Sequence, residues 1–305
     1  MDTELSPTQA RIVEQLRRGP DAPVWSDGFA DRLKEAVEGD LAELAEHFSK
    51  DRPLFLSKHA LTAIHSCEAN HQATTGSFEW SVPTARGTVA HRAIELGIHW
   101  RGEANPLELV DEALARLVDE TRGPGAWIAG LREAERAELR GEVGDLVTKF
   151  TECFPPLKPE WWPVTEGAIY VELLDKGLTM QGRPDLTLGK PGHKVVIDFK
   201  TGRPAGTHRD DLRYYALLET LRHGTPPRLT ATLYLDAARA EVETVTEGAV
   251  WAAARRAVDG VVKLVEIERL GRVPTRHGGP SCRWCPLLAD CAEGAAYLAS
   301  LEEEP

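Results

Sequence analysis

Four of the five cysteines in this chain lie far apart in the sequence but have the spacing of a single metal site. Three of them form a C-x2-C-x5-C pattern, at Cys282, Cys285 and Cys291, and the fourth, Cys67, lies more than two hundred residues upstream. Four thiolates are what a tetrahedral zinc ion or a 4Fe-4S cluster requires. If one centre binds all four, the fold must bring two distant parts of the chain together.

The cellular compartment also favours a metal centre over disulfides. The sequence has no apolar run of roughly eighteen residues and no signal-peptide pattern, so we expect a cytoplasmic protein without a membrane segment. Cysteines in that compartment are more often metal ligands than disulfide partners. Cys153 does not fit the pattern and is expected to be a buried free thiol. Spacing alone does not distinguish iron from zinc.

The net charge of -12 argues against a general nucleic-acid binder, which would carry a basic surface. It does not exclude a nuclease, because a local basic patch and a bound divalent metal can attract phosphate. Part of the negative charge lies in the first hundred residues and in a C-terminal run of three glutamates, Glu302 to Glu304.

Hydrophobic periodicity predicts a helical N-terminal region followed by an α/β core. Strands are expected over residues 169–172, 178–188, 194–200 and 229–235. Helices are expected over residues 57–67, about 84–96, most of 107–150, about 210–222 and about 250–270. The order strand, strand, strand, helix, strand is typical of an α/β fold.

A predicted β-hairpin places two carboxylates beside each other. If residues 191–192 form its two-residue tip, Leu188 faces Val195 and Asp185 faces Asp198. The Cβ atoms of the two aspartates would then lie about 5 Å apart. Two carboxylates this close require a cation, and an oxygen-rich site of this kind suits Mg²⁺ or Mn²⁺.

Lys200 lies two residues after Asp198 and shares its face of the strand, whereas Ile197 and Phe199 point to the opposite, core-facing side. A divalent ion there could polarise a phosphodiester, and Lys200 could position the attacking water. The alternative is a surface hairpin with a solvated aspartate and lysine.

These elements resemble the PD-(D/E)XK nuclease superfamily. Pro184-Asp185 matches its PD element, and Asp198-Phe199-Lys200 matches its (D/E)XK element. The D-x-K-T-G ending of the second strand is similar to the RecB-type branch. The resemblance implies a restriction-endonuclease-like core with a mixed central sheet flanked by helices, and catalysis by Asp185, Asp198 and Lys200.

The same resemblance implies further site residues. Gly87 and His91 fit an upstream G-x-x-x-H element on a helix, so the implied metal ligands are His91, Asp185, Asp198 and Phe199.

Two accessory positions follow from the resemblance as well. Glu172 matches an acidic position of the family and is either a supporting group or a surface residue. Tyr215 matches the tyrosine of a Gln-x-x-x-Tyr element, although it could equally be a core aromatic residue. Asp211 stands where the family has glutamine, so its role is open.

The resemblance also favours iron at the cysteines. An iron-sulfur subclass of RecB-type nucleases, including AddB-like subunits and CRISPR adaptation nucleases, has one cysteine before the nuclease core and three after it. It implies that Cys67, Cys282, Cys285 and Cys291 hold a 4Fe-4S cluster, with Zn²⁺ as the alternative. The implied organisation is a helical region at 1–54, a nuclease domain at 55–295 with a helical insertion at about 100–165, and an acidic tail at 296–305.

The expected activity is therefore that of an Mg²⁺- or Mn²⁺-dependent deoxyribonuclease. We expect it to be exonuclease-like or directed at single strands, in DNA repair, recombination or defence. Since the sequence has no G-x-x-x-x-G-K-[ST] phosphate loop, it is not expected to drive DNA unwinding itself. The alternatives are a DNA-binding subunit that acts only with a separate helicase or other repair or defence protein, and a zinc-ribbon-like interaction protein.

Overall fold

The computed structural model describes residues 4–17, 23–76, 78–103, 105–120 and 123–302. The last three residues of the expected acidic tail, 303–305, lie outside these ranges. The α-helices are α1 (Pro7–Leu16), α2 (Phe29–Asp40), α3 (Lys58–Ser66), α4 (Glu68–Thr74), α5 (Val82–His99), α6 (Pro106–Asp119), α7 (Gly125–Ala129), α8 (Glu133–Cys153), α9 (Gly206–His223), α10 (Glu247–Glu268) and α11 (Ala292–Glu302). Short 3-10 helices are η1 (Ala42–His47), η2 (Pro159–Trp161), η3 (Pro280–Trp284) and η4 (Leu288–Asp290).

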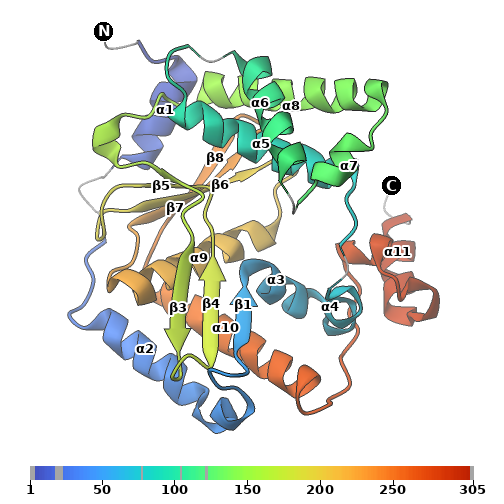
Figure 1. The fold of residues 1–305 in the computed structure, drawn as a ribbon. Coiled ribbons are helices and arrows are strands. Elements are labelled where there is room, and N and C mark those ends of the chain that lie inside the picture. The colour runs from blue at the N-terminus through green and yellow to red at the C-terminus, as the bar shows by residue number, and fades with distance from the viewer. Residues whose placement is uncertain (1–3, 18–22, 77, 104, 121–122, 303–305) are drawn as a thin grey trace.

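The strands form two mixed sheets. They are β1 (Leu54–Ser57), β2 (Val164–Thr165), β3 (Ile169–Leu173), β4 (Leu178–Gly182), β5 (Leu186–Leu188), β6 (Val195–Lys200), β7 (Leu229–Tyr234) and β8 (Arg239–Thr244). The larger sheet has the order β2-β5-β6-β7-β8, and the smaller has the order β1-β4-β3. Each sheet contains one parallel pair, β6 with β7 and β1 with β4. The expected α/β class with helices flanking mixed sheet structure is confirmed, although the strands form two sheets where one central sheet was expected (Figure 1).

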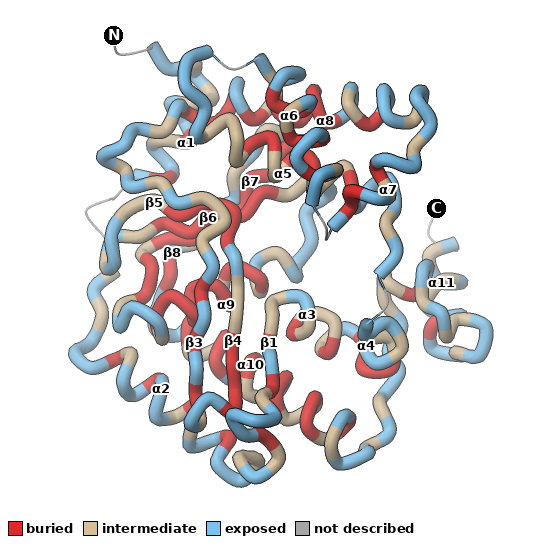
Figure 2. Tube along the Cα trace, viewed as in Figure 1, coloured by how far each residue is buried: buried red, intermediate tan, exposed pale blue. Residues whose placement is uncertain are grey.

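Helices cover both faces of the larger sheet. In Figure 1, α1, α5, α6 and α8 lie above it, and α9 lies below, between the sheet and α10. Helix α9 also contacts β3 and β4, so it packs against both sheets. Figure 2 shows that buried residues follow the strands and the facing sides of the long helices, whereas α11 is mostly exposed. Strand β6 is therefore the middle strand of the larger sheet and is covered by helices on both of its faces.

The residues of β6 alternate between two hydrophobic cores. Val195, Ile197 and Phe199 belong to the core beneath α5, α6 and α8, and Val196 belongs to the core around α9 and α10. The sequence predicted this alternation but identified only one face as a core. Both faces are buried, and Asp198 with its 2% exposure lies on the α9 face.

The hairpin has the register expected from the sequence. Leu188 pairs with Val195, and the ladder continues to Leu186 with Ile197. The backbone N–H of His193 donates to the carbonyl of Lys190 at 2.9 Å across the predicted tip, where Gly192 has a φ of +82°. This geometry suits a Pro-Gly turn of type II. Asp185 directly precedes the paired segment.

The structure differs from the sequence-based expectation at several strands, and the two-residue strand β2 was not predicted. The strand expected over 178–188 is broken at residues 183–185, so it contributes β4 to one sheet and β5 to the other. Strand β1 was not predicted, and its last residue, Ser57, was expected to begin a helix. Strand β8 was also missed: its charged residues alternate with Ala240 and Val242, but this edge strand has no buried residue.

The N-terminal helices pack into the body of the protein. Ile12 and Leu16 of α1 join the core beneath α5, and Phe29, Leu33 and Val37 of α2 join the core around α9 and α10. Within the described residues, every helix is too short or too polar to cross a membrane.

The close approach of β4 to α9 yields a stability test. A Cβ atom on Gly182 would lie 2.6 Å from Leu218 Cδ1 and 2.8 Å from the Tyr215 ring. Gly182→Ala should therefore lower the free energy of unfolding by about 1–3 kcal/mol, since these buried side chains have little room to move. Gly141→Ala, at an α8 position with nothing within 4 Å, should raise it by roughly 0.5–1 kcal/mol. Urea denaturation measures both, and equal effects would contradict the packing argument.

Candidate active site

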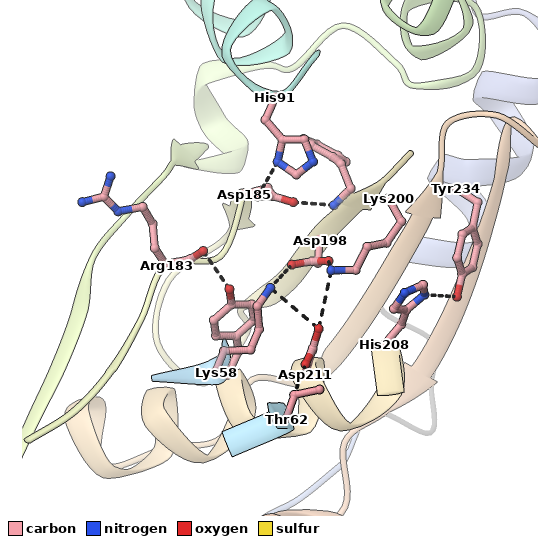
Figure 3. A network of polar contacts seen from close by, with 12 residues as sticks. Lys58, Thr62, His91, Arg183, Asp185, Asp198, Lys200, His208, Asp211 and Tyr234 are labelled. Atoms are coloured by element: carbon pink, nitrogen blue, oxygen red, sulfur yellow. Dashed lines mark hydrogen bonds and ion pairs between the residues drawn. The ribbon is translucent and has the colours of Figure 1, made fainter. Parts of the chain in front are cut away.

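Six charged or titratable side chains from different elements meet at the end of β6. Asp185 lies at the break between β4 and β5, and Asp198 and Lys200 lie on β6. Figure 3 shows His91 reaching this point from α5, and Lys58 and Asp211 reaching it from α3 and α9. The structure thus brings together the sequence-predicted His91, Asp185, Asp198 and Lys200, and adds Lys58.

One half of the site is a set of possible metal ligands. One nitrogen of His91 and one carboxylate oxygen each of Glu166 and Asp185 all lie within 4.8 Å of one another. His91 Nδ1 is 3.0 Å from Asp185 Oδ1. Burial opposes a charge on the imidazole, but the carboxylates of Asp185, Asp198 and Glu166 together raise the pKa of His91. The three groups offer one imidazole and two carboxylates to a cation.

Glu166 was not found by sequence reasoning. It lies between β2 and β3 with a left-handed φ of 50°, and its backbone N–H donates to the Asp185 carbonyl at 3.1 Å. This turn directs the glutamate toward His91 and Asp185. Burial, followed by the negative charge of Asp185, raises the pKa of Glu166 to about 7. A carboxyl group in this state is ready to lose its proton when a cation binds.

The other half of the site surrounds Asp198 with cations. Its Oδ1 accepts a hydrogen bond from Lys58 Nζ at 3.1 Å, and its Oδ2 lies 2.6 Å from Lys200 Nζ. Although burial opposes the charge, Lys58 and Lys200 lower the pKa of Asp198 well below its usual range. Asp198 is therefore an ionised carboxylate with one ammonium group beside each of its oxygens.

Asp211 belongs to this charged group. Its Oδ2 lies 3.8 Å from Lys58 Nζ and 3.5 Å from Lys200 Nζ, and its Oδ1 accepts a hydrogen bond from Thr62 at 3.0 Å. Asp211 is thus buried beside both lysines. Tyr215, one turn further along α9, lies beneath Lys58, whose Nζ is 5.0 Å from the ring centre.

Tyr215 and Phe199 position the backbone near Asp185. The Tyr215 hydroxyl donates to the Arg183 carbonyl at 2.8 Å, and the backbone N–H of Phe199 donates to Asp185 Oδ2. The Phe199 ring packs in the core against Phe150, so only its main-chain atoms are available to a ligand.

Glu172 lies apart from this group. Its carboxylate is exposed on β3 and lies 3.3 Å from Lys176 Nζ. The strand alternation turns Ile169, Val171 and Leu173 inward and Glu172 outward. The structure therefore favours the surface alternative for Glu172.

The four cysteines of the sequence pattern line one small cavity at the side of the molecule. Cys67 lies between α3 and α4, and Cys282, Cys285 and Cys291 lie on the segment before α11. Backbone N–H groups of Gly279 and Gly294 donate to the sulfurs of Cys282 and Cys291, each at 3.3 Å. All five cysteines are free, and Cys153 is buried elsewhere, as expected.

A buried ion pair also joins the two chain segments near this cavity. Glu68 accepts hydrogen bonds from Arg272 and from the backbone N–H of Thr275, at 2.9 Å and 2.8 Å. The hydrogen bonds from Arg272 hold the pKa of Glu68 at about 2. Because Glu68 is next to Cys67, these hydrogen bonds hold Cys67 beside the C-terminal segment without any bond between the cysteines.

The chain was compared with protein-family models, curated proteins and solved structures. A family model described as the PD-(D/E)XK nuclease superfamily matches residues 56–292, a range that includes every residue of the site and all four cavity cysteines. No curated protein matches the chain. A crystal structure of a "putative exonuclease" from Eubacterium rectale shows 10% identity and a TM-score of 0.49, covering 88% of this chain and 93% of that chain. The crystal structure of SSO0001 shows 15% identity and a TM-score of 0.31, covering 68% of this chain and 96% of that chain.

The raised pKa of Glu166 predicts a pH-dependent stability in the absence of metal. The folded protein holds this proton more tightly than the unfolded chain, so the stabilisation is present below pH 4.5 and is lost as the pH rises through about 7. Relative to Glu166→Gln, wild type should lose on the order of 1–3 kcal/mol of unfolding free energy between pH 5 and pH 8. Denaturant titrations with a chelator measure this difference.

The exposed Glu172→Gln variant is the matched control for this comparison. A constant difference between wild type and Glu166→Gln across the same pH range would show that Glu166 does not lie in the buried, negatively charged setting described.

Proposed function

The chain belongs to the PD-(D/E)XK nuclease superfamily, and from this we propose that it is a deoxyribonuclease that uses Mg²⁺ or Mn²⁺ to hydrolyse phosphodiester bonds. The observation that carries the proposal is the convergence of His91, Glu166 and Asp185 beside an ionised Asp198.

The donor set fits a hard divalent cation. Carboxylate oxygens suit Mg²⁺ and Mn²⁺, and the imidazole of His91 is a better ligand for Mn²⁺ than for Mg²⁺. We therefore expect Mn²⁺ to support activity at a lower concentration than Mg²⁺.

The residues have distinct proposed roles in hydrolysis. A bound ion would supply charge at the scissile phosphate and acidify a water molecule. Lys200, held 2.6 Å from Asp198, would donate hydrogen bonds to the water or to the phosphate oxygen on which charge develops. The water oxygen bonds to phosphorus, and the bond from phosphorus to one sugar oxygen breaks. That sugar oxygen takes up a proton and leaves as a hydroxyl.

We further propose that Cys67, Cys282, Cys285 and Cys291 hold a 4Fe-4S cluster, as in the iron-sulfur branch of RecB-type nucleases that the sequence resembles. The shared cavity and the N–H groups directed at the sulfurs support a site for thiolate ligands.

The cluster would have a structural role and lies outside the hydrolytic group. A helicase or other DNA-processing protein remains the proposed partner if the isolated chain cuts DNA poorly, because the surface charge of the protein is unfavourable to DNA.

Lys200→Ala should abolish cleavage without unfolding the protein. Loss of a donor at the reacting phosphate is expected to lower the rate by about 100-fold or more. The measurement compares linear single-stranded, linear double-stranded and circular DNA in Mn²⁺. Lys176→Ala removes an exposed lysine paired with Glu172 and should cut like wild type. Cleavage by Lys200→Ala at the wild-type rate would contradict the proposed role.

Cys282→Ala should remove the visible iron-sulfur absorbance and lower the stability of the protein. Because metal binding contributes to folding free energy, loss of one thiolate ligand weakens the link between distant segments. The Glu68–Arg272 contacts should keep the variant folded. Iron analysis of anaerobically purified protein, with Cys153→Ala as the control, tests this. Wild-type iron content in Cys282→Ala, or stoichiometric zinc in wild type, would contradict the cluster.

A further inference from the structure

Lys58 is a second lysine on the carboxylate of Asp198. Lys58 and Lys200 each approach one oxygen of Asp198, and each lies within 4 Å of Asp211 Oδ2. The two ammonium groups and the two carboxylates therefore form one compact cluster in which each ammonium group lies near both carboxylates. The net charge of this group is zero.

The charges of the proposed metal ligands also balance, once one divalent cation is bound. Asp185 and deprotonated Glu166 carry two negative charges, which one divalent cation neutralises. Asp198 and Asp211 carry two more, which the lysines already neutralise. A second divalent ion between Asp198 and Asp211 would have to displace an ammonium group and would leave an excess of positive charge.

Two helices hold Lys58 in place. Lys58 and Thr62 lie one turn apart on α3, and Asp211 and Tyr215 lie one turn apart on α9, so each helix presents two residues to the other. Thr62 holds Asp211, and the Tyr215 ring lies beneath the ammonium group. This arrangement explains why an aspartate in place of glutamine is tolerated at position 211: its charge is paired with the two lysines.

We propose that Lys58 acts as a built-in second cation of the active site and binds a phosphate oxygen of the DNA substrate, so that the site takes a single divalent ion. This inference rests on the proposed function. The side chains of Lys58 and Lys200 are 26% and 21% exposed, whereas that of Asp198 is 2% exposed. Both lysine side chains are thus partly accessible beside the buried carboxylate, so a phosphodiester could approach them. An ammonium group is a common point-charge ligand for phosphate.

Two binding measurements test the inference without relying on cleavage. The first counts Mn²⁺ bound to the full chain with its cysteine centre intact, by electron paramagnetic resonance. Wild type should bind one Mn²⁺ that is lost in Asp185→Asn. Lys58→Met, which keeps the side-chain bulk and removes the charge, should gain a second, magnetically coupled Mn²⁺. The second measures affinity for a short single-stranded oligonucleotide in Ca²⁺, which should fall about 10- to 100-fold in Lys58→Met.

Two variants control these measurements. Lys58→Arg retains the charge and should keep one Mn²⁺ and most of the DNA affinity. Lys263→Met removes a helix lysine of similar exposure, 28%, that also pairs with an aspartate, and it should behave as wild type.

Three results would overturn the inference. Two Mn²⁺ ions in wild type that are both lost in Asp185→Asn, or unchanged metal count and DNA affinity in Lys58→Met, would refute it and leave the proposed nuclease function intact. No Mn²⁺ bound by wild type would overturn the proposed function and this inference together.

Discussion

A buried, ionised Asp198 is the constraint on which the arrangement of the site depends. A carboxylate with 2% exposure can keep its charge only when cations lie close to it. Lys58 and Lys200 meet that requirement from α3 and from the end of β6, and Asp211 and Tyr215 hold them from α9. The negative charge of Asp198 therefore fixes the relative positions of α3, α9 and β6. A shift of any of these elements would leave that charge without a nearby cation.

The break between β4 and β5 connects this charged group with the metal ligands. Because the chain passes from the smaller sheet to the larger one at residues 183–185, Asp185 lies beside β6 without being part of the ladder. Its carboxylate accepts a hydrogen bond from the backbone of Phe199 and faces His91, while its carbonyl accepts one from Glu166. The backbone of β6 thus joins two groups of side chains with different proposed tasks: one would bind a cation and the other phosphate.

The sequence predicted the parts of the site that depend on local spacing. The register of the hairpin followed from its Pro-Gly tip, and the alternation along β6 placed Asp198 and Lys200 on one face. Glu166 could not be found in this way, because its direction depends on a left-handed turn of a residue other than glycine. Lys58 follows the Ser57 cap of α3 and carries no sequence signal of its own; only the packing of α3 against α9 brings it to Asp198. Strand β1 was missed for a related reason, since its pairing with β4 joins segments more than one hundred residues apart.

The central claim is that one cation binds between His91, Glu166 and Asp185, beside an Asp198 that keeps both of its lysines. Anomalous diffraction from crystals soaked in Mn²⁺ tests it most directly. The account predicts one manganese peak in contact with these three side chains and no manganese peak between Asp198 and Asp211. A manganese peak between Asp198 and Asp211, or none at His91, Glu166 and Asp185, would contradict it.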